Sequence, residues 1–281
     1  MAAVRSRKGK TIRNTLLHLV LAAGSLVMLL PFFWMVSTSL KPIFEVLTLQ
    51  IKWWPTHPLW ENYSQVWTML PFGRYFLNSL FVAVIVTAVV LITSSLAGYA
   101  FARFQFPGRN LLFLLYLGAL MVPGEVTIVP TFILMKYLGW IDTYQGLIVP
   151  QMFSVFGTFM MRQCFLSIPD DLENAAKIDG CGPFRIFSTI ALPLVRPTLA
   201  ALGIFSFLGT WNNFLWPLII TNKDALRTIP VGLVSFQGQF TTNWPVLMAA
   251  AASALVPILI VYILAQKHFI KGIMSSGMGG Q

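Results

Sequence analysis

The richest collection of chemistry-bearing side chains lies around the stretch NAAKIDGCGPFRIFSTIALP, which begins at Asn174 and ends at Pro193. Two glycines, two prolines and small residues stand there beside the acids Asp170, Asp171, Glu173 and Asp179. No His–Glu metal motif and no cluster of intramembrane aspartates accompanies them, so the pattern does not predict a reaction centre. We expect this polar segment to bind another surface, and we expect the chain not to be an enzyme.

Other reactive residue types are scattered. Cys164 and Cys181 lack the paired spacing of metal ligands, and three histidines lie far apart in the sequence. The tripeptide GKT at Gly9 resembles the end of a phosphate-binding loop, but Val4 stands where that motif requires Gly. The chain is therefore expected to bind no metal, nucleotide or other cofactor itself.

Helix signals divide the polar segment in two. Pro169 suits the start of a helix, Asp170 and Asp171 suit its first turn, and Gly180 is a natural stop, which predicts a helix over 169–179. A second short helix is expected from Pro183 to Pro193.

Side chains spaced three and four apart are expected to share a face of the first helix, and the second helix is expected to present aromatic residues. The first face comprises Leu172, Ala175, Ala176 and Asp179, and the second helix presents Phe184 and Phe187. An exposed apolar face in water fits either a helix lying on lipid headgroups or a docking element for a cytoplasmic protein. The flanking acids argue against anionic lipid.

The elements on both sides of this segment are apolar. Hydrophobic residues make up 57% of the chain and charged residues 10%, too few for the surface of a soluble domain. No charged residue lies between Arg13 and Lys41 or between Arg74 and Arg103. A helix needs about 20 apolar residues to cross a bilayer. We predict an all-α integral membrane protein with spans at 14–37, 76–98, 111–135, 143–162, 197–220 and 245–266.

The remaining segments follow from these spans. We expect a basic N-terminus at 1–13, an extracytoplasmic loop at 38–74, a membrane domain at 75–266, a cytoplasmic connection at 166–193 and a C-terminal tail at 267–281. The first span is interpreted as an uncleaved anchor, because its apolar part is longer than that of a signal peptide. With both termini in the cytoplasm, about two-thirds of the 19 Lys and Arg residues lie inside, as the positive-inside rule favours.

A few polar and aromatic residues within the spans are candidates for a solute path. Glu125 is the only acid within a predicted span, and Pro123 and Gly124 beside it would leave backbone groups that need partners. Asn212 and Asn213 are expected at a similar depth, and Trp211 and Trp216 are candidates for stacking on a sugar ring. The alternatives are that Glu125 reaches the headgroups and that Trp211 is an interfacial aromatic.

The polar segment resembles the EAA signature of the membrane subunits of bacterial ABC importers. Ala175, Ala176 and Gly180 fall in its register, and IALP at 190–193 matches its end. Asn174 departs from it, because the family usually has Glu there, and Glu173 lies one place earlier. The stretches LPFFWMVSTSLK, LAGYAFARFQFPGR and WNNFLWPLI resemble MalG-type permeases of carbohydrate importers.

This resemblance implies a type I importer fold of six transmembrane helices with cytoplasmic coupling helices, in the bacterial inner membrane. It implies sugar or oligosaccharide import together with a second MalF-like permease, an extracytoplasmic solute-binding protein and two ATPase subunits that bind ATP and Mg. The residues expected to couple to the ATPase are Glu173, Asn174, Ala175, Ala176, Asp179, Gly180, Phe184, Phe187 and Pro193. Where Asn174 removes a charge, docking is expected to use Glu173, Asp179 or packing.

Two alternatives stay open from the sequence. An ion-coupled secondary transporter would need inverted repeats and buried acids, of which Glu125 is the one candidate. An importer of the same family could instead carry a polyol or a glycerol phosphate ester.

Overall fold

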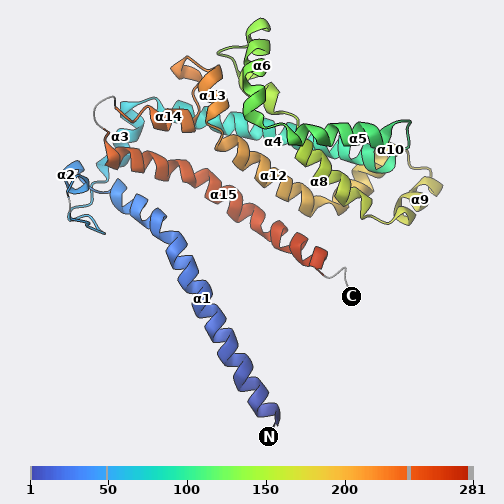
Figure 1. Ribbon diagram of the computed structural model, residues 1–281, viewed down its shortest axis with the longest axis horizontal. Coiled ribbons are helices and arrows are strands. Elements are labelled where there is room, and N and C mark those ends of the chain that lie inside the picture. Colours follow the sequence, from blue (N-terminus) through green and yellow to red (C-terminus); the bar gives the residue numbers. More distant parts are fainter. Residues whose placement is uncertain (1, 49, 239–241, 278–281) are drawn as a thin grey trace. The chain divides into compact units, whose positions relative to one another are not determined.

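The computed structural model describes residues 2–48, 50–238 and 242–277, and it describes side chains between residues 13 and 264. Over these residues the chain is helical, and its one pair of bridged extended residues is Gln237 with Thr242. Two compact units divide it, the first formed by 1–70 with 235–253 and the second by 71–234 with 254–281 (Figure 1).

The α-helices, in chain order, are α1 (Ala2–Ser39), α2 (Ile43–Val46), α3 (Glu61–Met69), α4 (Phe72–Arg103), α5 (Arg109–Gly118), α6 (Gly124–Tyr137), α7 (Tyr144–Ile148), α8 (Val155–Leu166), α9 (Asp170–Ile178), α10 (Pro183–Ile186), α11 (Leu192–Leu194), α12 (Arg196–Trp211), α13 (Leu215–Ile220), α14 (Ile229–Val234) and α15 (Trp244–Gly277). A π-helical turn, Phe187–Ala191, joins α10 to α11.

The first unit contains a long apolar helix and a tightly bonded loop. From Arg13 to Ser39, α1 is long and apolar enough to cross a membrane. Its leucines and valines are largely exposed, as expected of side chains that face lipid. Beyond its end, Lys41 is buried and donates through Nζ to the Lys52 carbonyl at 2.6 Å.

The second unit is built around α4. Helices α8 and α12 pack along it (Figure 1), and their buried core includes Val86, Met161 and Leu202. A Cβ added to Gly98 would lie 2.7 Å from the Met161 Cβ and 2.9 Å from the Arg162 nitrogen, so this glycine allows α4 and α8 to cross closely. Helices α8 and α12 are both packed against the long helix α4.

The predicted spans are present with different degrees of continuity. Three are continuous helices in the described residues, Arg13–Ser39, Phe72–Arg103 and Trp244–Leu264. The structure has a bent pair of helices where a single span is predicted at 111–135. There α5 with its following turn meets α6 at 99°. Pro123 lies at that bend, and because proline has no backbone N–H it cannot donate the hydrogen bond that would continue the preceding helix.

The other two predicted spans are also interrupted. The span expected at 197–220 ends as α12 at Trp211, and α13 follows after a break. Before it, the helix that starts at Pro183 turns by 78° into α12 beside Pro197. The span expected at 143–162 consists of α7, a short turn containing Pro150, and α8. In the described part of the chain, three helices are long and apolar enough to cross a membrane, or up to five spans when each bent pair is counted as one, so the predicted number of six is not confirmed.

Candidate functional site

The site is built on α9, the first helix of the polar segment. Three acids occupy its first turn and Lys177 its last, an arrangement that complements the helix dipole. Gly180 takes a left-handed φ of 78°, and the Cys181 N–H donates to the Ala176 carbonyl at 2.9 Å. This turn ends the helix where the sequence predicts.

The two faces of α9 differ from the expected ones. Glu173 and Ala176 are buried, whereas Leu172 and Ala175 are exposed. At about 100° per residue, Ala176 lies about 60° around the helix from the buried Glu173, whereas Ala175 lies nearly opposite to Glu173. The expectation that Leu172, Ala175, Ala176 and Asp179 share one exposed face was therefore wrong for Ala176.

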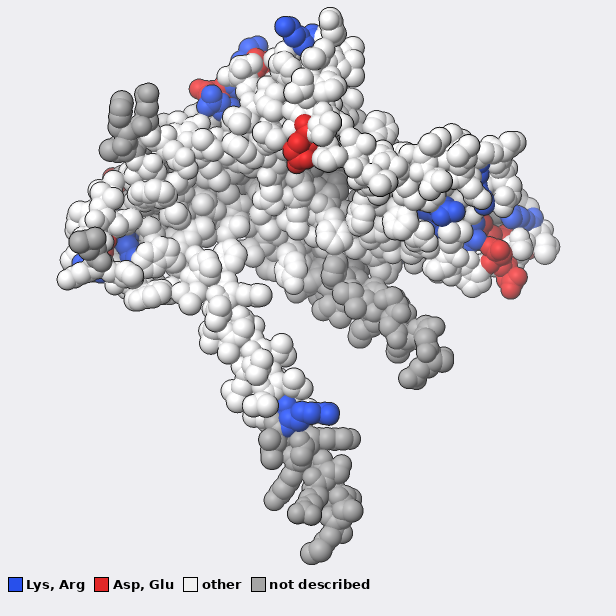
Figure 2. All heavy atoms as spheres, in the orientation of Figure 1, with Lys and Arg blue, Asp and Glu red and all other residues white. Residues whose placement is uncertain are grey.

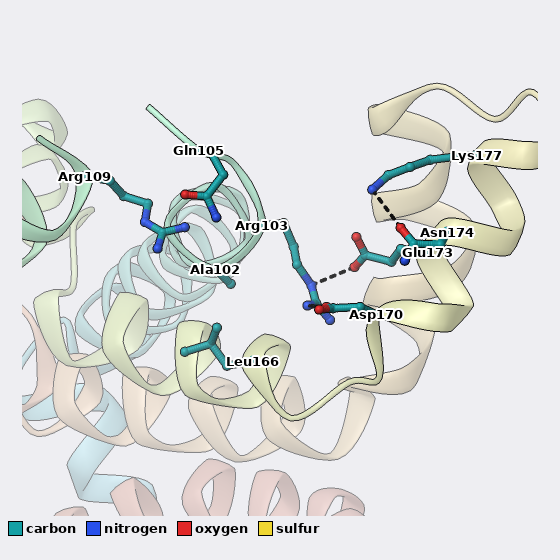
Figure 3. A pocket seen from close by; sticks show the side chains of 9 residues that line it. All are labelled: Ala102, Arg103, Gln105, Arg109, Leu166, Asp170, Glu173, Asn174 and Lys177. Carbon is teal, nitrogen blue, oxygen red and sulfur yellow. Dashed lines mark hydrogen bonds and ion pairs between the residues drawn. The ribbon is translucent and has the colours of Figure 1, made fainter. Parts of the chain in front are cut away.

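The inner face of α9 is held by charge. Arg103, the last residue of α4, lies with its Nε 2.9 Å from Glu173 Oε1. The same guanidinium donates to the Ile168 carbonyl at 2.6 Å and pairs with Asp170. Tyr99 donates its hydroxyl to Glu173 Oε2 at 3.3 Å. Figure 3 shows Arg103 reaching across to α9. We call Tyr99, Arg103, Asp170 and Glu173 the Arg103 cluster.

A polar pocket of about 370 Å³ opens beside this cluster. Asn174 lies on its rim and accepts a hydrogen bond from Lys177 Nζ at 3.3 Å. Arg109 lies on the opposite side of the pocket from Lys177 in Figure 3. Asn174 therefore has a partner on its own helix and remains exposed.

The outer surface of the polar segment is apolar and uncovered in this chain. Ile178 is 87% exposed, Phe184 is 74% exposed and Leu172 is 46% exposed. We call Leu172, Ala175, Ile178 and Phe184 the outer face. The sequence analysis missed Ile178, although it stands three residues after Ala175, and it missed Arg103 and Tyr99, which are distant in sequence from α9. Exposed apolar side chains surrounded by polar residues are typical of interaction surfaces.

The second helix of the segment has one face in the core. Phe187 is buried, and its ring centroid lies 5.1 Å from that of Tyr99 and 6.2 Å from that of Phe165. Pro193 does not end the helix as expected, because the π-turn carries the chain on to Leu194. Pro193 lies at the start of α11, where a missing N–H is tolerated.

The residues considered for a solute path differ in their exposure. Glu125 is exposed near the start of α6. Trp211 is 2% exposed, stacks on Phe207 and donates to the Ala254 carbonyl at 3.3 Å. Its indole offers no free face on which a sugar could stack in this arrangement.

The two asparagines differ as well. Asn213 donates to Gln151 Oε1 at 2.8 Å, whereas Asn212 is exposed.

Charge is confined to parts of the surface. Figure 2 shows Lys, Arg, Asp and Glu side chains gathered over α9 and its surroundings, while most of the face drawn over α4 and α12 is uncharged. In the described residues, no group of three His, Cys, Asp or Glu side chains is placed to hold a metal ion. The arrangement is suited to binding a partner surface at α9.

Comparisons with known proteins agree with this architecture. Residues 91–275 match the model of the binding-protein-dependent transport system inner membrane component. The chain is 34% identical over 277 residues to the arabinooligosaccharides transport system permease protein AraQ of Halalkalibacterium halodurans, with 98% of this chain and 99% of that protein covered. It is 36% identical over 282 residues to the sn-glycerol-3-phosphate transport system permease protein UgpE of Yersinia pestis, with 97% and 99% covered.

Solved structures show the same fold at low sequence identity. A chain of a bacterial ABC transporter involved in the import of the acidic polysaccharide alginate superimposes with a TM-score of 0.82 at 22% identity, covering 92% of this chain and 96% of that one. A chain of the MetNI methionine ABC transporter gives a TM-score of 0.53 at 14% identity, covering 75% of this chain and 96% of that one. The family match extends over the Arg103 cluster and the outer face. This chain belongs to the family of binding-protein-dependent transport system inner membrane components.

Proposed function

We propose that this chain is a permease subunit of an ATP-driven importer that moves a sugar or oligosaccharide into the cytoplasm. The observation that carries the proposal is the outer face of α9 and α10, which is apolar, exposed and joined to the membrane-crossing helix α4 through Arg103. A relative named for arabinooligosaccharide transport supports the solute class. A relative named for sn-glycerol-3-phosphate transport makes a glycerol phosphate ester the second candidate.

The proposed assembly contains this chain, a second permease, two ATPase subunits in the cytoplasm and an extracytoplasmic solute-binding protein. ATP and Mg would bind to the ATPase subunits, and this chain contributes no catalytic residue. Both termini would lie in the cytoplasm of a bacterial inner membrane, the orientation favoured by the distribution of Lys and Arg.

The roles of the segment differ by face. The outer face, with Asn174 and Asp179, would contact the ATPase, whereas Glu173, Ala176 and Phe187 would keep the segment attached to the bundle. Gly180 and Pro193 would shape the segment. Glu125, Asn212 and Asn213 remain candidates for the solute path.

The test is co-purification of the ATPase subunit with tagged chain from membranes of the native bacterium. Ile178→Glu places a charge in an apolar contact and is expected to weaken ATPase binding by roughly tenfold or more, since hot-spot truncations cost about 2 kcal/mol. Ile178→Val keeps the apolar contact and is the matched control. Retention of the ATPase by Ile178→Glu at the wild-type ratio would contradict the docking role.

Uptake identifies the energy source and the solute. Proteoliposomes of the purified assembly with its binding protein are given labelled arabinotriose or labelled sn-glycerol 3-phosphate. Import that requires internal ATP and survives a protonophore is expected. Import that is driven by an ion gradient without ATP would instead establish a secondary transporter.

A further inference from the structure

The attachment of α9 to the membrane helices is unusual in its chemistry. The buried residues of α9 are Glu173 and Ala176, so the helix contributes little apolar surface to the core. Arg103 is 10% exposed and Glu173 is 6% exposed at their side chains, and both are buried in the same contact. The inner face of α9 is therefore held chiefly by an ion pair that water hardly reaches.

Arginine suits this position better than lysine would. Its planar guanidinium presents several donors in a fixed fork, and here it meets Glu173, Asp170 and the Ile168 carbonyl together. These acceptors lie just before α9 and in its first turn, so one side chain fixes the direction in which the helix begins. The contact of Arg103 Nε with Glu173 Oε1 is an ion pair outside hydrogen-bond geometry.

Tyr99 completes the cluster from the preceding turn of α4. Its hydroxyl donates to Glu173 Oε2, and its ring packs edge-on against Phe165 at 5.3 Å between centroids. Since Tyr99 and Arg103 are four residues apart on α4, both side chains project from one face of that helix. Glu173 is thus held by two residues of the same rigid element.

We propose that the Arg103 cluster is a coupling latch that makes α9 and the last turn of α4 move as one body when the ATPase moves α9. The inference rests on the proposed function, because it takes the ATPase as the source of movement. It makes Arg103, Glu173 and Tyr99 positioning residues, which act through α9 without touching the ATPase or the solute. Force on the outer face then reaches a helix long enough to cross the membrane.

Glu173 and the neighbouring Asn174 have separate tasks in this account. Glu173 is 5% exposed and its carboxylate is paired with Arg103 of the same chain, whereas Asn174 is exposed and uncharged. Docking at α9 consequently depends on the outer face, and removal of the Glu173 charge is expected to spare ATPase binding while it loosens α9.

The experiment measures the distance between α9 and the end of α4 in the purified assembly. Spin labels are attached to cysteines that replace the exposed residues Gln105 and Lys177, with Cys164 and Cys181 replaced by Ser. Distances are recorded by electron paramagnetic resonance without nucleotide and with MgATP and vanadate. The latch predicts one narrow distribution that is the same in both states.

Breaking the pair is expected to release α9. Glu173→Gln and Arg103→Gln should each widen the distribution by roughly twofold and make it depend on nucleotide, as local opening does when a stabilising contact is lost. The double variant should be no wider than the single variants, because the two residues act through each other. Arg196→Gln removes an exposed cytoplasmic-side Arg and is the control, expected to match the wild type.

The outcomes separate this inference from the function on which it rests. If wild-type and both Gln variants give the same narrow distribution in both states, the latch is overturned. If no ATPase co-purifies with the wild type, the proposed function fails, and the distribution without nucleotide still decides whether the pair holds α9. If a Gln variant does not insert, Arg103→Lys and Tyr99→Phe replace it, and unchanged widths in both overturn the latch.

Discussion

Two parts of the second unit use a carboxylate to tie distant segments together, and they do so differently. At the end of α4, Glu173 meets the side chains of Arg103 and Tyr99. Near the beginning of α7, Asp142 Oδ1 accepts backbone N–H groups from Asn222 at 2.6 Å and Lys223 at 2.9 Å.

The difference lies in what each carboxylate holds. Asp142 takes a φ of 55° and donates its own N–H to the Ile220 carbonyl at 3.0 Å, so two loops are joined backbone to backbone. Glu173 is joined only through long side chains in the contacts described for it. Both carboxylates hold separate segments together, but only Asp142 does so through backbone groups. The comparison therefore contrasts a side-chain tie, which joins α9 to the end of α4, with a static backbone tie at Asp142.

The largest expected effect comes from Arg103→Ala. It leaves the Glu173 carboxylate buried without its ion-pair partner, and we expect a loss of about 3 kcal/mol in the free energy of unfolding. Chemical unfolding in mixed micelles measures it. Asp170→Ala is the control, because Asp170 is 78% exposed and an exposed pair contributes at most about 1 kcal/mol. Equal losses of unfolding free energy in the two variants would contradict the prediction that the buried Glu173 pair stabilises the fold more than the exposed Asp170 pair.

The close crossing of α4, which carries Arg103, with α8 is tested by Gly98→Ala. The added Cβ would lie 2.9 Å from the Arg162 backbone nitrogen, and we expect a cost of about 2 kcal/mol for the displacement of α8. Gly118→Ala meets nothing within 4 Å and should leave the free energy of unfolding unchanged or slightly raised. Wild-type stability of Gly98→Ala would mean that the close crossing is not needed.

The static tie is tested by Asp142→Ala, which removes an acceptor of two backbone N–H groups. We expect a loss of about 1.5 kcal/mol at neutral pH, typical of a hydrogen bond to a charged group. Proteolysis in the loop at 221–223 should rise with it. Asn222→Ser keeps the backbone N–H that Asp142 accepts and removes only the side-chain donor to the same carboxylate, so a smaller loss is expected from it.

The same residue predicts a dependence on pH. Burial acts to raise the pKa of Asp142, but the N–H groups of Lys223 and Asn222 hold it below its ordinary value of 3.8. Because the folded pKa is depressed, its stabilisation is present above about pH 4 and is lost as pH falls through the folded value. Acid titration of the unfolding midpoint should show a steeper fall below pH 4 for wild type than for Asp142→Ala. Parallel curves would contradict the assignment.

The smallest expected change is at Gly180, where α9 ends. Gly180→Val forces a β-branched residue into the left-handed region and should cost about 1 kcal/mol, with weaker ATPase co-purification. Gly180→Asn is the control, because Asn tolerates that conformation. No atom lies within 4 Å of an added Cβ, so any loss in the Val variant comes from the backbone conformation. Full co-purification with Gly180→Val would show that the turn is dispensable.

The sequence by itself determined the local features of this protein. Charge-free stretches predicted the long apolar helices, and Pro169, the early acids and Gly180 predicted α9 to within a residue. These signals act between near neighbours in the chain, through hydrogen-bonding periodicity, the helix dipole and allowed φ values.

Only the tertiary structure decided which side chains are buried and paired and which face outward. It selected Glu173 as the buried acid among four nearby acids, because Arg103 and Tyr99, far away in sequence, both reach it, whereas Asp170 pairs with Arg103 from the exposed surface. It also buried Trp211 and Phe187, and it turned Ile178 outward. Burial depends on how separate helices pack against one another, and the core contacts join residues that lie far apart in the chain.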